Sequence, residues 1–181
     1  TFARLMSELV EMRGRIPTAL VLGGESSTAI VQQVADWLVE RNVCVGASST
    51  AGLRIGTQRI RADRGSAFKD TRALSIDPSV EAMVIGTDGK EFLATGLPLD
   101  RFDVLVVAGW NTAVNGDTRT AAAHLRSMLA FLEPHCEGQV LVARDHHAAA
   151  VATSVFGRKR IQMTESADEL AVRLTQALSA R

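Results

Sequence analysis

The sequence has no excess of charge of either sign and no long apolar run. Lysine plus arginine number 20 and aspartate plus glutamate number 20, so neither a nucleic acid nor an anionic membrane is indicated as a partner. No apolar run approaches the roughly 20 residues that a membrane-spanning helix needs. Residues 1–13 carry charges throughout and contain no apolar segment typical of a secretory signal, so we expect a soluble protein.

Cysteine is nearly absent as well, with only Cys44 and Cys136 in the chain. The two lie in different apolar surroundings and do not have the spacing of metal ligands. We expect both to be reduced, buried thiols, which indicates a cytoplasmic protein. The chain starts at Thr1 rather than at methionine, and we expect it to be a fragment of a longer protein.

What the sequence does have is an ordinary globular composition, with 46% hydrophobic and 22% charged residues among 181. This length fits a single domain, residues 1–181, with a full core. Short apolar runs predict buried strands, and apolar residues at helical spacing predict amphipathic helices between them. The strands are expected at 19–22, 43–47, 82–85, 104–108, 140–143 and 160–163, and the helices at 1–12, 28–40, 119–132, 148–155 and 167–178.

Apolar strands that alternate with amphipathic helices predict the α/β class. We expect a three-layer α/β/α domain whose mostly parallel sheet is covered on both faces. A hairpin is expected where residues 52–55 and 58–60 flank Gly56 and Thr57. Ligands of such sheets bind at the carboxyl ends of the strands, so the loops of interest are 23–27, 48–52, 86–91, 109–116 and 144–147.

Residues 59–69 are polar and basic, with Arg59, Arg61, Arg64 and Lys69 close together. We interpret this stretch as an exposed, solvated loop. Attraction of an acidic polymer or a nucleotide is the alternative.

Several stretches follow one another in an order more specific than a general α/β pattern. The strongest of them is GLPLDRFDVLVVAG, which runs from Gly96 to Gly109. On this run and the residues below, the chain resembles the central domain of Mur ligases, and most closely that of cyanophycin synthetases, over about residues 18–155. The other matching residues are Ser49, Thr50, Gly52 and Ile55 in the hairpin segment, Arg72, Asp77, Pro78 and Val80 in the next segment, and Asp145 in the last turn.

The resemblance implies a P-loop-like Mur ligase central domain. In the family this domain binds ATP and Mg²⁺, phosphorylates a carboxylate and lets an amine attack the acyl phosphate, which forms an amide bond. The implied partners are neighbouring domains of the parent chain, and a homo-oligomer stays open. ATP and Mg²⁺ are implied as cofactors only if the family activity is retained.

The residues aligned with the family's catalytic positions differ from the family pattern. The family P-loop ends in Gly-Lys-Thr, whereas Ser27 stands at the lysine position here and only Thr28 keeps a hydroxyl that would face Mg²⁺. Gly86 aligns with a metal-binding glutamate, and Val142 aligns with an asparagine that contacts adenine. From this alignment, Ser27→Lys together with Gly86→Glu is predicted to raise nucleotide affinity. Because these positions differ from the family pattern, no catalytic residue is assigned.

The candidate nucleotide- or anion-binding residues lie at the start of the expected helix 28–40, where free backbone amides attract anions. No metal ligand is assigned, apart from Thr28 if Mg²⁺ is bound. The alternative is that Ser26 or Ser27 only caps the helix. The candidate residues are Gly23, Gly24, Ser26, Ser27 and Thr28.

Three hypotheses from different classes follow, and whether the chain is an enzyme stays open among them. The first is a catalytically degenerate scaffold or assembly domain of a larger protein. The second is an ATP-dependent ligase that joins an acid to an amino acid with the help of neighbouring domains. The third is a regulatory module that binds an anion or a nucleotide without chemistry.

Other polar residues are given structural interpretations. Asp145 is expected to cap the helix that follows it, with His146 and His147 on its first turn rather than on a metal. Asp100, Arg101 and Asp103 could form a site, but a structural ion pair is the favoured interpretation of these residues. The loop residue Trp110 is expected either to fill the place of a nucleotide or to pack against a neighbouring domain.

Overall fold

A computed structural model describes residues 15–23, 25–109, 118–143 and 146–164, together with 169, 172 and 173. Within this part, eight strands and five α-helices alternate along the chain, joined by two short 3-10 helices, η2 (Glu133–His135) and η3 (Arg158–Arg160). The strands are β1 (Thr18–Leu22), β2 (Val45–Ser49), β3 (Gly52–Ile55), β4 (Gln58–Arg61), β5 (Ala82–Thr87), β6 (Val104–Val107), β7 (Val140–Ala143) and β8 (Ile161–Thr164). The helices are α2 (Glu25–Val39), α3 (Ala67–Ser75), α4 (Lys90–Thr95), α5 (Thr118–Leu132) and α6 (His146–Phe156).

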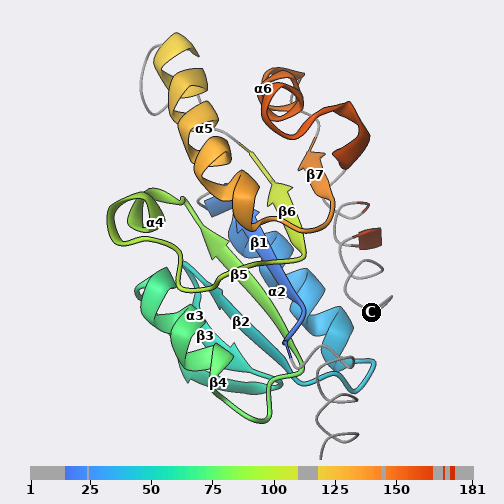
Figure 1. Cartoon of the computed structure of the whole chain (residues 1–181). Helices are drawn as coiled ribbons and strands as arrows, with labels where there is room; N and C mark the ends of the chain where they lie inside the picture. The colour runs from blue at the N-terminus through green and yellow to red at the C-terminus, as the bar shows by residue number, and fades with distance from the viewer. Residues whose placement is uncertain are drawn as a thin grey trace, which may run out of the picture.

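All eight strands form one sheet, in the order β4-β3-β2-β5-β1-β6-β7-β8 (Figure 1). Neighbouring strands from β2 to β8 are parallel, whereas β3 and β4 form antiparallel pairs at one edge. In the strand order, β2 lies on one side of β1 and β6 lies on the other, so the strand order reverses its direction at β1. The mostly parallel α/β fold and the hairpin predicted from the sequence are confirmed.

Helices cover both faces of the sheet because the central strands are apolar on both. Ala19 and Val21 of β1 pack in the cluster that holds the apolar side of α2, including Val34. Leu20 and Leu22 pack in the larger cluster, which holds the buried residues of α3, α4, α5 and α6. This arrangement is the three-layer architecture expected from continuous apolar strands (Figure 1).

The interpretation of residues 59–69 as one exposed loop is confirmed for 62–66 and is wrong at both ends. Gln58–Arg61 is strand β4, which pairs with β3, and Ala67–Ser75 is helix α3, which Ser66 caps by accepting from the amide of Lys69. The helix is short and polar overall, with few apolar residues; Asp70, Thr71 and Leu74 are buried nonetheless. Helix α4 was not predicted either, since it has only six residues.

The predicted helix at 1–12 lies outside the described residues, as does nearly all of the one at 167–178. None of the helices in the described part combines the length and the apolar character that crossing a bilayer requires. The single-domain boundary at 1–181 stays a prediction.

Candidate functional site

The candidate site lies where β1, β5 and β6 end side by side. The Gly23 amide donates to the Thr87 carbonyl of β5 at 3.1 Å, and the Ala108 amide donates to the Leu22 carbonyl at 2.7 Å. A Cβ on Gly23 would lie 3.1 Å from the Ala108 Cβ and 3.2 Å from the Gly109 nitrogen, so this turn accepts only glycine without a shift. The chain leaves β1 here at the switch in strand order, which is where ligands of open α/β sheets bind.

Helix α2 begins at Glu25, directly after this turn. Ser26 and Ser27 therefore lie inside the first turn rather than before it, and the interpretation that either one occupies the capping position is not supported by these bounds. The Ser26 amide donates to the Gly23 carbonyl at 3.1 Å, and the Ser26 side chain is exposed. Gly24, the remaining candidate residue, lies outside the described residues.

Ser27 is fully buried between α2 and β5, opposite Gly86. Gly86 pairs with Val21 of β1 in the middle of the parallel sheet. A Cβ on Gly86 would lie 2.9 Å from the Ser27 Oγ and 3.0 Å from the Val31 Cγ2. The helix and the strand are thus in contact at this point, and a side chain at position 86 would require the side chains of Ser27 and Val31 to shift.

Thr28 and Thr50 bring two hydroxyl groups together at the same edge. Their Oγ1 atoms are 2.5 Å apart, and both residues are partly buried. Asp88, which follows β5, is paired with Arg64 at 3.2 Å and caps the amide of Lys90. In the described part of the chain, no three His, Cys, Asp or Glu side chains are grouped so that they could hold a metal ion.

These observations test whether the residues suit the Mg²⁺ and ATP that the fold implies. Mg²⁺ is held by carboxylates together with phosphates and water. The pair of Thr28 and Thr50 offers hydroxyls, and the glutamate position is the closely packed Gly86. The described residues therefore do not fit a bound Mg²⁺.

A buried polar cluster that the sequence did not reveal links β2, β4 and α3. Asp70 is 4% exposed and accepts hydrogen bonds from the Ser48 Oγ at 2.8 Å and from the Arg61 guanidinium at 2.9 and 2.7 Å. These bonds to Asp70 raise the pKa of Arg61 above its ordinary value, although its burial acts in the opposite direction. The three residues are on separate elements, so no local motif signals the cluster.

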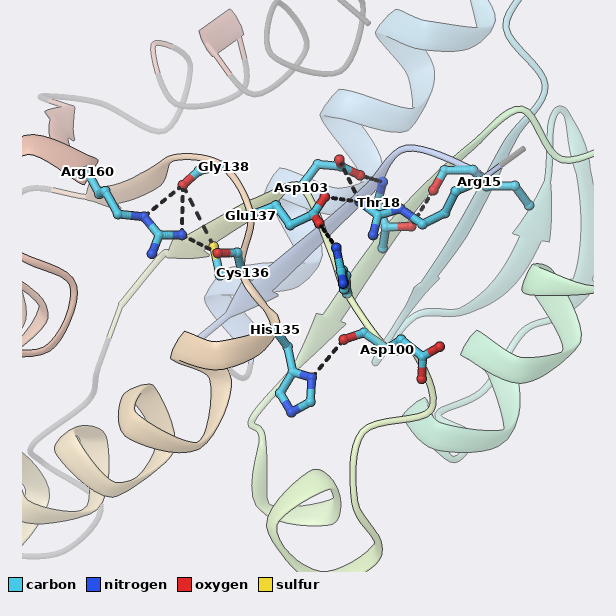
Figure 2. Close-up of polar contacts among 11 residues, drawn as sticks. Arg15, Thr18, Asp100, Asp103, His135, Cys136, Glu137, Gly138 and Arg160 are labelled. Atoms are coloured by element: carbon cyan, nitrogen blue, oxygen red, sulfur yellow. Dashed lines mark hydrogen bonds and ion pairs between the residues drawn. The ribbon is translucent and has the colours of Figure 1, made fainter. Parts of the chain in front are cut away.

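A second network holds the opposite, amino-terminal ends of the strands (Figure 2). Asp103 accepts from the Thr18 amide at 2.8 Å and from Arg15 at 3.0 Å, which confirms that Asp103 forms a structural ion pair. Arg101 pairs with Glu137 at 2.5 Å. The hydrogen bond from Arg101, and then the charge of Arg15, hold the pKa of Glu137 below its usual range. This network is structural, since it lies away from the switch in strand order.

His135, His146 and His147 lie on two separate elements, η2 and α6. The Nδ1 of His135 is 2.7 Å from the Asp100 carbonyl, a contact that links η2 to the segment before β6. His146 and His147 are the first two residues of α6, as expected from the sequence. Asp145 and Trp110 lie outside the described residues.

Comparison with known proteins identifies the fold. No protein-family model matches the sequence, and no curated protein matches it either. A UDP-N-acetylmuramoyl-L-alanyl-D-glutamate–2,6-diaminopimelate ligase matches with a TM-score of 0.62 and 14% identity, over 86% of this chain and 33% of that chain. A folylpolyglutamate synthase from Thermotoga maritima matches with a TM-score of 0.50 and 12% identity, over 90% and 44%.

A bifunctional folylpolyglutamate synthase/dihydrofolate synthase with Mn, AMPPNP and L-glutamate bound matches with a TM-score of 0.52 and 14% identity, over 89% of this chain and 46% of that chain. The class of the domain is therefore a three-layer α/β domain with a mostly parallel sheet. More particularly, its fold matches the central domain of Mur ligases. The chain spans between a third and a half of the length of these ligases.

Proposed function

We propose that the chain is a Mur-ligase-type central domain that acts as a scaffold or assembly domain of a larger protein and has lost amide-bond formation. The observation that carries this proposal is the contact of Gly86 with α2. The position aligned with the metal-binding glutamate has no side chain, and a Cβ there would already lie 2.9 Å from Ser27, which stands at the lysine position. The likeness of the sequence to cyanophycin synthetases supports descent from an amide-forming ligase.

The neutral character of the site supports the same proposal. Phosphoryl transfer depends on cations that neutralise the developing charge on the phosphates. Among the described candidate residues, Ser26, Ser27 and Thr28 supply hydroxyls and backbone amides, and none supplies a positive charge. A helix N-terminus contributes roughly 1 kcal/mol to binding an anion, whereas micromolar affinity needs about 8 kcal/mol.

An ATP-dependent ligase that works with neighbouring domains is the second candidate. The fold match to a structure with Mn, AMPPNP and L-glutamate bound favours it. In this case the missing cations would come from other domains of the parent protein.

Calorimetric titration with Mg·ATP separates the two candidates. We expect the chain to bind Mg·ATP no more tightly than millimolar, and Thr28→Ala to leave this weak binding unchanged. A dissociation constant in the low micromolar range that Thr28→Ala weakens at least tenfold would refute the scaffold proposal. The full-length protein is then assayed for ATP turnover with amino acids as acceptors, where robust turnover supports the ligase.

A further inference from the structure

A polar pocket lies beside the hairpin of β3 and β4. It has a volume of about 320 Å³ and lies between α2 and the β2–β3–β4 edge of the sheet. Its polar lining comes from Gln32, Asp36, Ser49, Arg54, Thr57, Arg59 and Arg61. This volume is at the small end of the range for ligand pockets.

Two arginines face each other across the strands that form this pocket. Arg54 of β3 and Arg59 of β4 are register partners, and Arg54 is also the partner of Ala47, whose side chain packs in the α2 cluster. Arg54 and Arg59 therefore lie on the α2 face of the hairpin. Like charges directly opposite one another destabilise a sheet unless an anion offsets them.

The carboxylates near the pocket do not offset these charges fully. Asp36 binds Arg54 Nη1 at 2.7 Å, but its side chain is 65% exposed. Arg61 is neutralised by the buried Asp70 on the opposite face. Among the described residues, no carboxylate forms an ion pair with Arg59. The pocket thus keeps a net positive charge.

One edge of the Arg54 guanidinium lacks acceptors. Its Nε and Nη2 are buried and have no hydrogen-bond partner within the described residues. These two nitrogens lie on the same edge of the guanidinium and match the two oxygens of a carboxylate or phosphate. Buried donors that are left unsatisfied are costly, so their orientation indicates a missing acceptor.

We propose that this pocket binds an oxyanion, a carboxylate or phosphate group of a small metabolite, through the fork of Arg54 and the charge of Arg59. Thr57 and Gln32 supply neutral hydrogen bonds beside it. The Arg54 side chain is 25% exposed and lines the pocket, where its Nη1 is held by Asp36. The proposal does not depend on ATP binding at the carboxyl end of β1.

The proposal is tested by titrating the protein with inorganic phosphate, with glutarate and with sodium chloride at matched ionic strength. The amide signals are followed by NMR. We expect phosphate or glutarate, but not chloride, to shift the signals of Gln32, Thr57 and β3 in a saturable manner. Binding of one probe and not the other identifies which oxyanion the site takes. Signals that shift with neither probe, or equally with chloride, overturn the proposal.

Matched variants assign the effect to the two arginines. Arg59→Gln is on an exposed strand position and is expected to weaken binding about tenfold, since the oxyanion loses a charged hydrogen-bond donor. Arg54→Lys keeps the charge but loses the fork, so a comparable loss is expected. The control Arg72→Gln makes the same charge change at an exposed position of α3 and leaves the affinity unchanged. Arg59→Gln with unaltered affinity contradicts the assignment.

Discussion

Gly86 shows how a single side-chain position decides the packing at the carboxyl end of the sheet. From the alignment alone, adding Glu at this position and Lys at position 27 was the expected route to nucleotide binding. The contacts of Gly86 remove the basis for that prediction, because even a methyl group there would touch Ser27 and Val31. The difference arises because alignment compares residue types and contains no information on the distance between a strand and a helix.

Gly86→Ala is expected to destabilise the fold by about 1–3 kcal/mol, the usual range for overpacking a well-packed core. Urea unfolding measures the change. Gly109→Ala is the matched control, since a Cβ there would lie 3.4 Å from the Ser26 Oγ, an ordinary contact. Equal free energies of unfolding for the two variants would show that α2 and β5 separate easily.

Cys136 has a buried thiol whose pKa is shifted by its surroundings. Burial raises the pKa of its thiol to about 11 from an ordinary value of 9.0, although the charge of Arg160 acts to lower it. The unfolded chain therefore loses this proton first as the pH rises. The resulting stability is fully present below about pH 9 and is lost between about pH 9 and 11.

The size of this loss is roughly 2–3 kcal/mol, from about two pKa units at about 1.4 kcal/mol each. Unfolding free energies measured by urea at a series of pH values in this window test the prediction. Cys136→Ala should remove this part of the pH dependence. A wild-type curve that parallels the variant's would rule out the thiol as its source.

At the scale of elements, the Asp70 cluster fastens the edge hairpin to the body of the sheet. Its two donors, Ser48 and Arg61, lie on β2 and β4, while Asp70 itself is on α3. Asp70 accepts one hydrogen bond from Ser48 and two from Arg61. A buried carboxylate holds elements together only when all of its hydrogen bonds are made. The hairpin position is therefore set by this cluster as well as by the backbone bonds of β3.

Asp70→Asn is expected to destabilise the fold by about 2–3 kcal/mol, since it leaves Arg61 without its buried partner. Asp63→Asn is the control, because Asp63 lies 3.3 Å from the Nε of the same arginine but is 79% exposed. The loss of stability in Asp63→Asn should be below about 1 kcal/mol. Chemical denaturation compares the two, and an Asp70 effect no greater than the Asp63 effect would mean that the cluster is not stabilising.

At the scale of the whole molecule, position in the sheet should set local stability. The five residues of β1 are all buried between β5 and β6, whereas β4 is an edge strand with mainly exposed residues. Opening of the edge hairpin disrupts one strand pair, but opening of β1 disrupts the centre of the core.

Native-state hydrogen exchange is therefore expected to be slowest in β1, β5 and β6 and much faster in β4. Exchange in the central strands should follow the global free energy of unfolding as urea is added. Protection of β4 amides equal to that of β1 would contradict this order. Phosphate at saturating concentration provides an internal comparison, since the proposed oxyanion pocket adjoins β3 and β4.

The sequence by itself determined the class of the fold and the region of the candidate site. Continuous apolar runs such as 140–143 predict strands buried on both faces. Gly56-Thr57 between two short runs predicts the hairpin. Both patterns are local, so they can be recognised without knowledge of the rest of the chain. The helix α3 was missed because it has only nine residues, is polar overall, and buries the polar residues Asp70 and Thr71.

Only the tertiary structure decided which distant side chains meet. The contact of Gly86 with Ser27, the cluster around Asp70 and the facing pair of Arg54 and Arg59 all join segments that are separated in sequence. Such contacts depend on strand register and on the distance between a helix and the sheet, which are set by the packing of the whole core. In the basic stretch 59–69, Arg61 therefore holds Asp70 in the folded chain, whereas Arg59 lines the pocket proposed to bind an oxyanion.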